Sequence, residues 1–362
     1  MEGPRSPLES EYSRVLEFLN SELRPDSGWS LASEYPTALS PNNLNNIRII
    51  TQAERVLSHA VIKPLIIRSP LAILKIAAIG SVVTVEDHRN QGLSRRILEN
   101  CLEEARAQDC DLAMLWTNLY DFYRKLDFEL AGSEISCLFE DEWAVDATGL
   151  RFVKGTQVSP EAILRLYTQH TVGSVRTAEE VRKFLQIPLT QCYTAWDAQN
   201  QLVAYAIEGK GADLTDYVHE WGGSASKLVA LFSYIRKDNK KPFTAIIPHH
   251  SQNLLAQLKK VPGHVLNEGF LGMIKIVQHE NFFGKVRKAA RSLGMQDFVL
   301  EKVGTAFNIG IGQDLISLSD EKDLIKILLG PQVEVPYLQP ETVEKLGKFL
   351  PLPLWVWGWD SV

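Results

Sequence analysis

A change of hydrophobic period near residue 90 constrains the fold of this chain more than any other feature. Before it, three segments rich in isoleucine and valine are separated by short polar stretches, a pattern typical of an antiparallel meander: Ile47–Thr51, Arg55–Ile67 and Leu71–Val85. After it, apolar residues recur at every third or fourth position from Leu93 onward, which predicts an amphipathic helix. A strand that leads directly into a helix indicates a mixed α/β (α+β) fold.

The segments on either side extend this unit. A helical pattern covers Pro7–Leu23, and the chain after the amphipathic helix predicts a strand at Asp111–Thr117, a helix at Leu119–Lys125 and a strand at Phe128–Phe139. Gly80 falls inside the third strand of the meander. A glycine at such a position predicts a bulge or a close approach of the backbone to another group.

The length of the chain predicts more than one domain. At about 150 residues per domain, 362 residues make two or three. We expect three, with limits at 1–145, 146–280 and 281–362, because an acidic, linker-like stretch begins at Glu140. The second unit repeats the kinds of element found in the first, although the residues themselves do not repeat.

Composition excludes several functional classes. A net charge of -6 gives no overall attraction to nucleic acid, and the charged run Arg236–Lys241 lacks the interleaved aromatic residues of a nucleic-acid site. The N-terminus has no apolar segment typical of a secretory signal, and no apolar run is long enough to span a membrane. We therefore expect a cytoplasmic protein with no membrane span and no nucleic-acid partner.

The chain carries no pattern typical of a metal site. Its four cysteines lie far apart, so we expect reduced, mostly buried thiols. The pair His249-His250 is not accompanied by further ligands, and a surface loop is the preferred interpretation. No metal is expected.

The segment 81–95 has the features of a phosphate site. In it a strand runs through a turn into a helix, whose first amides lack internal partners and lie at the positive end of the helix dipole. Gly92 and the small Ser94 allow oxygens to approach, and Arg89 and Arg95 add positive charge. An ordinary strand, turn and helix with surface arginines would give the same pattern.

Two motifs carry a family resemblance. Residues 89–94 read R-N-Q-G-L-S and residues 122–128 read F-Y-R-K-L-D-F. Through these motifs and the order of its elements, the sequence resembles the GNAT superfamily of N-acetyltransferases, whose motifs are R/Q-x-x-G-x-G/A and F-Y-x-K-L-G-F. It departs from them at Ser94, where glycine or alanine is usual, and at Asp127, where a glycine normally permits a tight turn.

Three later stretches resemble a narrower group, the enhanced intracellular survival-type acetyltransferases. They are Tyr217–Gly223, Phe307–Gly312 and the C-terminal P-L-P-L-W-V-W-G-W-D-S-V. This resemblance covers nearly the whole chain. It implies tandem GNAT folds with mixed central sheets, the second one degenerate, followed by a sterol carrier protein-like α/β domain.

The resemblance implies acetyl-CoA as the cofactor. Within the family, the strand at 82–84 turns amides toward the thioester carbonyl, and the residues after the next strand flank the pantetheine. The positions that match cofactor-binding positions are Val82, Val83, Thr84, Arg89, Asn90, Gln91, Gly92, Leu93, Ser94, Arg95, Asn118 and Leu119.

The resemblance also implies catalytic groups. Tyr123, with a reference pKa of about 10, matches the family's proton donor to the departing thiolate. In the narrower group the C-terminal carboxylate is the general base, which corresponds here to Val362. A chain end without a catalytic role remains an alternative, as do His219 and Glu220 as bases. The tryptophan-rich tail is too apolar to stay in water, so we expect it to dock.

The function implied is direct transfer of an acetyl group from acetyl-CoA to a primary amine, on a small molecule or a lysine side chain. Homo-oligomerisation stays open. The alternatives are a catalytically silent acyl-CoA-binding or sensor protein and a lipid- or protein-binding module built on the C-terminal domain.

Overall fold

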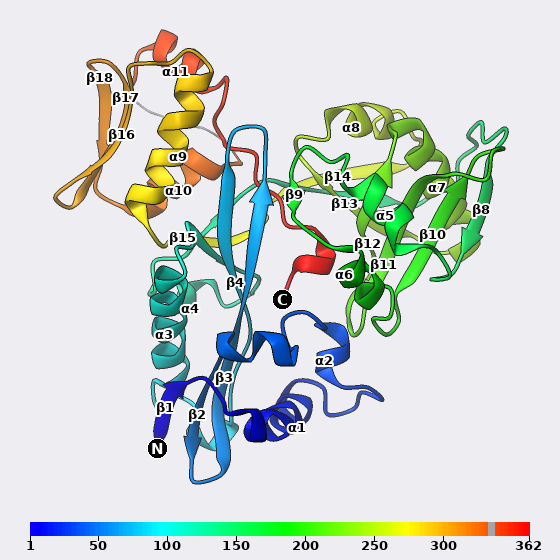
Figure 1. The fold of residues 1–362 in the computed structure, drawn as a ribbon. Helices are drawn as coiled ribbons and strands as arrows, with labels where there is room; N and C mark the ends of the chain where they lie inside the picture. The colour runs from blue at the N-terminus through cyan, green and yellow to red at the C-terminus, as the bar shows by residue number, and fades with distance from the viewer. Residues whose placement is uncertain (332–336) are drawn as a thin grey trace.

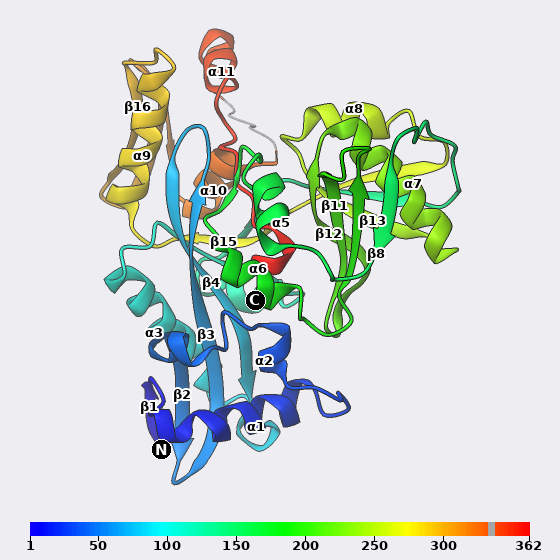
Figure 2. The same cartoon turned by 45° about the vertical axis from the view of Figure 1, so that its right-hand side comes forward.

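The computed structural model describes residues 1–331 and 337–362. Within them the chain forms three sheets in three lobes (Figure 1). The N-terminal lobe lies at the bottom of the view, the middle lobe at the right and the C-terminal lobe at the upper left. The C-terminus lies among them, between the strand β4 and the helix α6 in both views (Figure 2).

The first sheet follows the order β1-β2-β3-β4-β5-β15-β6, with β9 paired to β3. Only β4 and β5 pair in parallel. The strands are β1 (Glu2–Arg5), β2 (Ile47–Gln52), β3 (Arg55–Arg68), β4 (Ile73–Thr84), β5 (Leu112–Leu115), β6 (Glu129–Ala131), β9 (Gly173–Ser174) and β15 (Gly272–Ile276). The helices are α1 (Tyr12–Leu23), α2 (Leu31–Glu34), α3 (Leu93–Ala107) and α4 (Tyr120–Arg124). The predicted meander and amphipathic helix are confirmed.

Helices cover both faces of this sheet because successive strand residues point to opposite sides. On β3, Ala60 and Ile62 pack with Ile97 of α3, whereas Val61 packs with Val15 of α1. The amphipathic helix thus covers one face and the N-terminal helix covers the other.

The second sheet follows the order β14-β7-β13-β12-β11-β10-β8. Its strands are β7 (Glu134–Phe139), β8 (Arg151–Lys154), β10 (Gln191–Trp196), β11 (Leu202–Lys210), β12 (Asp213–Gly223), β13 (Phe243–Pro248) and β14 (His264–Gly269). Its helices are α5 (Pro160–Tyr167), α6 (Ala178–Phe184), α7 (Ala225–Asn239) and α8 (Gln252–Leu258). The parallel pair β12 and β13 is joined through α7 and followed by α8, as β4 and β5 are joined through α3 and followed by α4. This repetition agrees with the expected tandem GNAT folds.

The two sheets exchange strands. The single strand expected at Phe128–Phe139 is wrong, because the chain turns at Gly132, where φ is +73°, and places β6 in the first sheet and β7 in the second. A Cβ on Gly132 would lie 2.6 Å from Leu271 Cβ, so a larger residue would not fit. Later the chain returns, and β15 inserts between β5 and β6. The second sheet therefore contains a strand from before the domain limit expected at residue 145, and the first sheet contains a strand from after it. The three-domain division stays a prediction.

The C-terminal lobe contains a three-stranded antiparallel sheet and three helices. They are α9 (His279–Ser292), β16 (Phe298–Val303), β17 (Ala306–Ile311), β18 (Asp314–Leu318), α10 (Glu321–Leu329) and α11 (Pro340–Leu346). The sterol carrier protein-like assignment of this lobe stays a prediction. After α11 the chain runs back to the centre of the molecule.

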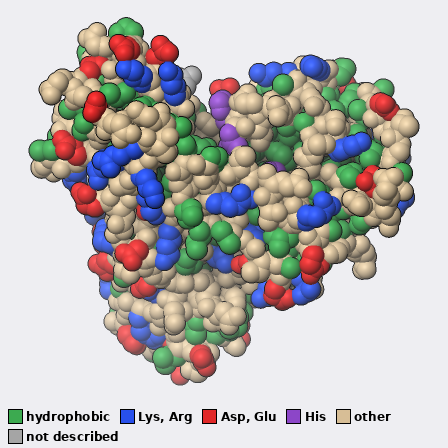
Figure 3. All heavy atoms as spheres, turned by 45° about the horizontal axis from the view of Figure 1, so that its top comes forward, with side chains coloured by type: hydrophobic (Ala, Val, Ile, Leu, Met, Phe, Trp, Pro, Cys, Tyr) green, Lys and Arg blue, Asp and Glu red, His purple; other side chains and the backbone are tan. Residues whose placement is uncertain are grey.

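Other sequence expectations concern cysteines, metals and membranes. All four cysteines are buried and free: Cys101, Cys110, Cys137 and Cys192. Over residues 1–331 and 337–362, no cluster of three metal-ligating side chains occurs and no helix is long and apolar enough to cross a membrane. Figure 3 shows acidic and basic side chains interspersed, with histidines in the hollow between two lobes. His249 and His250 line a small cavity together with Ser133, Leu329 and residues 351–354.

Candidate active site

The predicted bulge in β4 is confirmed. Two residues of β4, Ser81 and Val82, face the single residue Ala60 of β3. Ser81 takes a left-handed conformation with φ of +49°, and the neutral ring of His59 donates a hydrogen bond from Nδ1 to its carbonyl oxygen at 2.8 Å. Burial lowers the pKa of His59 to about 4, so this ring is uncharged at neutral pH. The bulge therefore begins directly after Gly80 and is held from β3.

Just before the bulge, β4 separates from its parallel neighbour. The pairing of β4 with β5 covers only Ile76–Ala78, yet β4 continues to Thr84. Among the strands of the described residues, β3 and β5 are the only partners of β4. The edge that faced β5 consequently has free backbone groups from Ile79 onward, which an extended ligand with amide groups can pair with.

The start of α3 is suited to bind an anion. Gly92 is its N-cap, with φ of +78°, and no side chain caps the helix. A Cβ on Gly92 would meet nothing within 4 Å, so the space in front of the amides is open. Ser94 Oγ bonds to Thr84 Oγ1 at 2.8 Å and ties this helix to the end of β4. The exposed residues around the opening are Arg89, Asn90, Gln91, Gly92 and Arg95.

Two further positions of the expected cofactor site follow β5. Asn118 and Leu119 are both exposed, and 61% of the surface of Leu119 is accessible although it is apolar. In contrast Leu93 is only 3% exposed, so it offers a backbone amide while its side chain packs in the core. Val82 and Val83 are half-buried on β4.

Tyr123 lies on α4, on the α3 side of the sheet. Its ring is 6% exposed and packs edge to face against Phe122 and Phe128. Burial, with a smaller effect from Cys101, raises the pKa of Tyr123 to about 12. The hydroxyl is therefore protonated across the physiological range.

The turn after Tyr123 is retained despite the missing glycine. Asp127 adopts φ of +63°, a left-handed conformation that aspartate tolerates better than most residues. Its carboxylate also pairs with Lys275 of β15 at 3.0 Å. The departure from the family motif thus replaces the residue but preserves the turn.

A cavity of about 500 Å³ lies on the opposite face of β4, between the first two lobes. Tyr123 is not among its lining residues. It is lined by Leu23, Arg24, Leu31, Tyr35, Ser81, Trp116, Glu134, Lys210, Asp213, Leu214, Tyr217, His219, Ile246, Leu271, Trp355, Val356, Gly358, Ser361 and Val362. The sequence motifs contain part of this lining, namely Ser81, Tyr217, His219 and the tail residues, and the other wall residues were not singled out from sequence.

One charged group of this cavity has no partner. Asp213 pairs with Arg24 at 3.0 Å and accepts a hydrogen bond from Tyr35, while Lys210 is bonded to carbonyls of the tail. For the side chain of Glu134 no hydrogen bond or ion pair is found within residues 1–331 and 337–362, and burial is the only influence on its pKa. Burial raises its pKa to about 7.

The C-terminal tail is docked, as its composition predicted, and forms part of the cavity wall. Trp355, Trp357 and Trp359 are at most 2% exposed. Val362 lies against the bulge, since a Cβ built on Gly80 would be 2.5 Å from the carboxyl carbon of Val362. The close approach expected at Gly80 is therefore an approach of the chain end.

The two alternative bases are placed differently. His219 lines the cavity, but its Nε2 donates to the Gly209 carbonyl at 3.0 Å, and its ring packs under Gly358. Burial lowers its pKa to about 3. Glu220 is fully buried in an ion pair with Arg176 and does not line the cavity.

Comparison with known families identifies the first lobe. Residues 9–131 match the family model described as an acetyltransferase (GNAT) domain. The first lobe is a GNAT acetyltransferase domain. Membership of this family supports an acyltransferase that takes its acyl group from an acyl-CoA.

Solved structures resemble the chain beyond its GNAT domain. A GCN5-related N-acetyltransferase from Anabaena variabilis has a TM-score of 0.64 at 15% identity, over 97% of this chain and 98% of that one. A probable N-acyltransferase from Enterococcus faecalis has a TM-score of 0.62 at 14% identity, over 98% of this chain and 97% of that one. Eis1 from Mycobacterium abscessus has 0.54 at 11%, over 87% and 84%. Such identities establish a shared fold alone. No curated protein matches the chain.

Proposed function

We propose that this protein is an N-acetyltransferase that moves the acetyl group of acetyl-CoA directly to a primary amine. One observation carries the proposal: the carboxyl group of Val362 packs against Gly80, at the bulge of the GNAT domain and in the wall of a cavity large enough for a small molecule. A base, a free strand edge and an acceptor cavity thus meet at one strand.

The cofactor would be held by three groups of residues. The uncapped start of α3, with Arg89 and Arg95, suits the pyrophosphate, the free edge of β4 at Val82–Thr84 suits the pantetheine amides, and the exposed Asn118 and Leu119 flank it. When bound, acetyl-CoA supplies a thioester whose carbonyl carbon accepts the amine nitrogen and whose sulfur departs with the electron pair.

The protein would move two protons. The Val362 carboxylate accepts one from the attacking amine, and amides of the bulge donate to the carbonyl oxygen as it gains negative charge. Tyr123 donates its hydroxyl proton to the sulfur, consistent with a pKa of about 12, which keeps this hydroxyl protonated. The amine thus becomes an amide, coenzyme A leaves as a thiol, and solvent restores the tyrosine proton.

The cavity favours a small amphipathic amine as the acceptor. Its walls are mostly apolar, and Glu134 is the charged group left free to attract an ammonium. This ammonium would release one proton to solvent before the neutral nitrogen attacks and passes its second proton to Val362. A volume of about 500 Å³ lies within the roughly 300–1,000 Å³ usual for small-molecule sites.

The test compares three variants of the chain end. Deleting Val362, or adding one glycine after it, moves the carboxylate, whereas Val362→Ala keeps the carboxylate and removes only the side chain. Coenzyme A release is measured with acetyl-CoA and a panel of phenethylamine, spermidine and a lysine peptide, and calorimetry measures acetyl-CoA binding.

We expect the deletion and the extension to lose about 10²-fold or more in kcat with unchanged acetyl-CoA affinity, and Val362→Ala to stay active. A fully active extended protein would exclude the chain end as base. Binding of acetyl-CoA without turnover of any amine in wild type would favour a silent acyl-CoA-binding protein.

A further inference from the structure

The tail that carries Val362 cannot be placed by its apolar side chains alone. Trp355, Trp357 and Trp359 repeat every second residue, and all three are buried. Trp357 packs against His170 with ring centroids 4.2 Å apart, and Trp359 stacks on Phe184 at 5.5 Å. If the tail slipped by two residues, each indole would enter its neighbour's pocket, so burial of the indoles sets the register only weakly.

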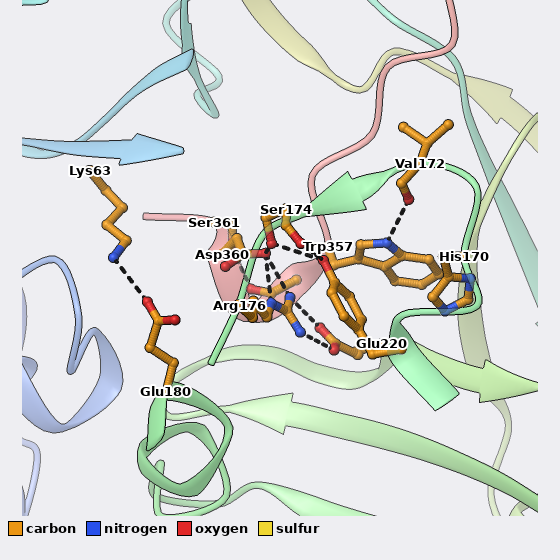
Figure 4. Close-up of polar contacts among 12 residues, drawn as sticks. Lys63, His170, Val172, Ser174, Arg176, Glu180, Glu220, Trp357, Asp360 and Ser361 are labelled. Atoms are coloured by element: carbon orange, nitrogen blue, oxygen red, sulfur yellow. Dashed lines mark hydrogen bonds and ion pairs between the residues drawn. The ribbon is translucent and has the colours of Figure 1, made fainter. Parts of the chain in front are cut away.

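A buried ion cluster breaks this repetition (Figure 4). Asp360 is the one acidic side chain of residues 352–362. Its Oδ2 accepts hydrogen bonds from Arg176 Nε at 3.0 Å and Nη2 at 2.7 Å, and from the Ser174 hydroxyl. The other side of the guanidinium binds Glu220, and its face lies 4.0 Å from the Tyr167 ring centroid.

Arg176 keeps its positive charge although it is buried. Burial alone lowers the pKa of a guanidinium, but Asp360 and Glu220 raise the pKa of Arg176 well above its ordinary value. Arg176 is therefore a fixed cation between a carboxylate of the middle lobe and a carboxylate of the tail. Displacing Asp360 would break the hydrogen bonds that Arg176 and Ser174 donate to it and leave buried donors unsatisfied, although Glu220 would still pair with Arg176.

Lys210 holds the tail at a second point. It belongs to β11 and is 1% exposed. Its Nζ donates to the carbonyls of Gly358 at 2.9 Å and Ser361 at 2.6 Å, and to the Ser361 hydroxyl at 3.1 Å. These three acceptors match the three protons of an ammonium group, and although burial lowers the pKa of Lys210 to about 7, the nearby Asp360 favours the charged form. The second contact is made one residue before Val362.

We propose that Arg176 and Lys210 are positioning residues, which fix the register of the tail and thereby hold the carboxyl group of Val362 at Gly80. The inference rests on the proposed base role of Val362. Two residues span at most about 7 Å, so fixing Asp360 already confines the chain end. With the Ser361 carbonyl also held, mainly the backbone angles of Val362 itself remain free.

The alternative is that the cluster merely stabilises the fold. Buried ion pairs are often no more stabilising than well-packed apolar residues, and their best-attested use is to specify one arrangement among several. A periodic apolar tail is a case that needs such specification.

The chain provides a matched pair of variants for the test. Asp360→Asn and Glu220→Gln each remove one buried carboxylate from the same guanidinium, but only Asp360 belongs to the tail. Lys210→Met removes the second contact and keeps the length of the side chain. Hydrogen exchange of the amides of residues 357–361 reports tail docking without any substrate. The kcat and KM values are measured for acetyl-CoA with phenethylamine, or with a faster amine of the panel.

We expect Asp360→Asn and Lys210→Met to speed exchange in the tail and lower kcat by about 10²-fold, with the KM for acetyl-CoA unchanged. Glu220→Gln should keep both the tail exchange rate and kcat within about threefold of wild type. This should hold even if its melting temperature falls as much as that of Asp360→Asn. Equal losses of kcat in Asp360→Asn and Glu220→Gln would overturn the positioning role. So would unchanged tail exchange in Asp360→Asn and Lys210→Met. Neither result would bear on the proposed function. A loosened tail with unchanged kcat would instead overturn the base role of Val362, and the inference with it.

Discussion

Replacing Gly80 by alanine tests the contact on which the mechanism depends. The backbone of Gly80 lies outside the left-handed region, so alanine can adopt it and the added methyl acts through its size alone. That methyl would lie 2.5 Å from the carboxyl carbon of Val362 and 2.8 Å from its oxygen. Because carbon atoms need about 3.5 Å, the chain end has to move by about 1 Å.

The expected loss follows from this displacement. A misplacement of about 1 Å in a catalytic group lowers the rate by about 10²-fold, which corresponds to about 2.7 kcal/mol of the activation barrier. Overpacking of a buried site also destabilises a protein by about 1–3 kcal/mol. We therefore expect kcat to fall about 10²-fold while acetyl-CoA still binds, with a moderate decrease in melting temperature.

A double-mutant cycle separates the chain end from other effects of the methyl group. Steady-state coenzyme A release is measured for wild type, Gly80→Ala, the Val362 deletion and the combination. If the methyl acts by displacing Val362, it has little further effect once Val362 is absent. Gly284→Ala is the control, since its Cβ meets nothing within 4 Å in α9, and it should leave kcat unchanged. Wild-type turnover in Gly80→Ala, or full additivity in the cycle, would refute the reasoning.

Substitutions at three further positions probe other parts of the site. Tyr123→Phe should lower kcat by about 10²- to 10⁴-fold and leave calorimetric acetyl-CoA affinity unchanged; unchanged turnover would remove Tyr123 from the mechanism. Glu134→Gln should raise the KM for cationic amines above pH 7. Because folding raises this pKa from 4.5 to about 7, ionisation of Glu134 weakens the wild-type fold as pH rises through that window. The melting temperature of the Gln variant should therefore rise relative to that of wild type between pH 4.5 and pH 7. If the substitution left the KM for amines unchanged, Glu134 would be excluded as a substrate contact. Asp127→Gly should keep or raise the free energy of unfolding. Asp127→Val should lower it by at least about 1 kcal/mol in denaturant titrations, because valine does not tolerate φ of +63°. Equal stabilities of the two variants would contradict this expectation.

The local parts of the fold were predictable from sequence. Apolar alternation and the shift to a helical period located β2, β3, β4 and α3 within one or two residues. Gly80 in a strand predicted the bulge, and the composition of the tail predicted its docking. These features depend on neighbouring residues, so a short window of sequence contains them.

The strand exchange was not predictable in this way. The apolar alternation of Phe128–Phe139 is interrupted at Gly132 and resumes in the opposite phase at Ile135, but nothing in this pattern indicates which sheet each half joins. β15 has only five residues, and its neighbours are chosen by packing against Leu112–Leu115, far away in the sequence. The first half of β12 carries polar residues, which hid an 11-residue strand.

The cavity walls were equally hidden. Lys210 stands between two glycines next to a turn, which is where an exposed lysine is expected, yet it is buried by the tail. Glu134 and Arg176 are ordinary charges in sequence and become functional candidates only when the lobes meet. Asp360 did carry a signal, as a lone carboxylate in an apolar segment.

The exchange of strands has a consequence for synthesis of the protein. A ribosome delivers the chain from its N-terminus, so β5 and β6 emerge long before β15, the strand that lies between them. Until residues 272–276 are available, both edges stay open and prone to pairing with other chains. The GNAT lobe therefore cannot finish folding on its own, and fragments that end near residue 145 should aggregate.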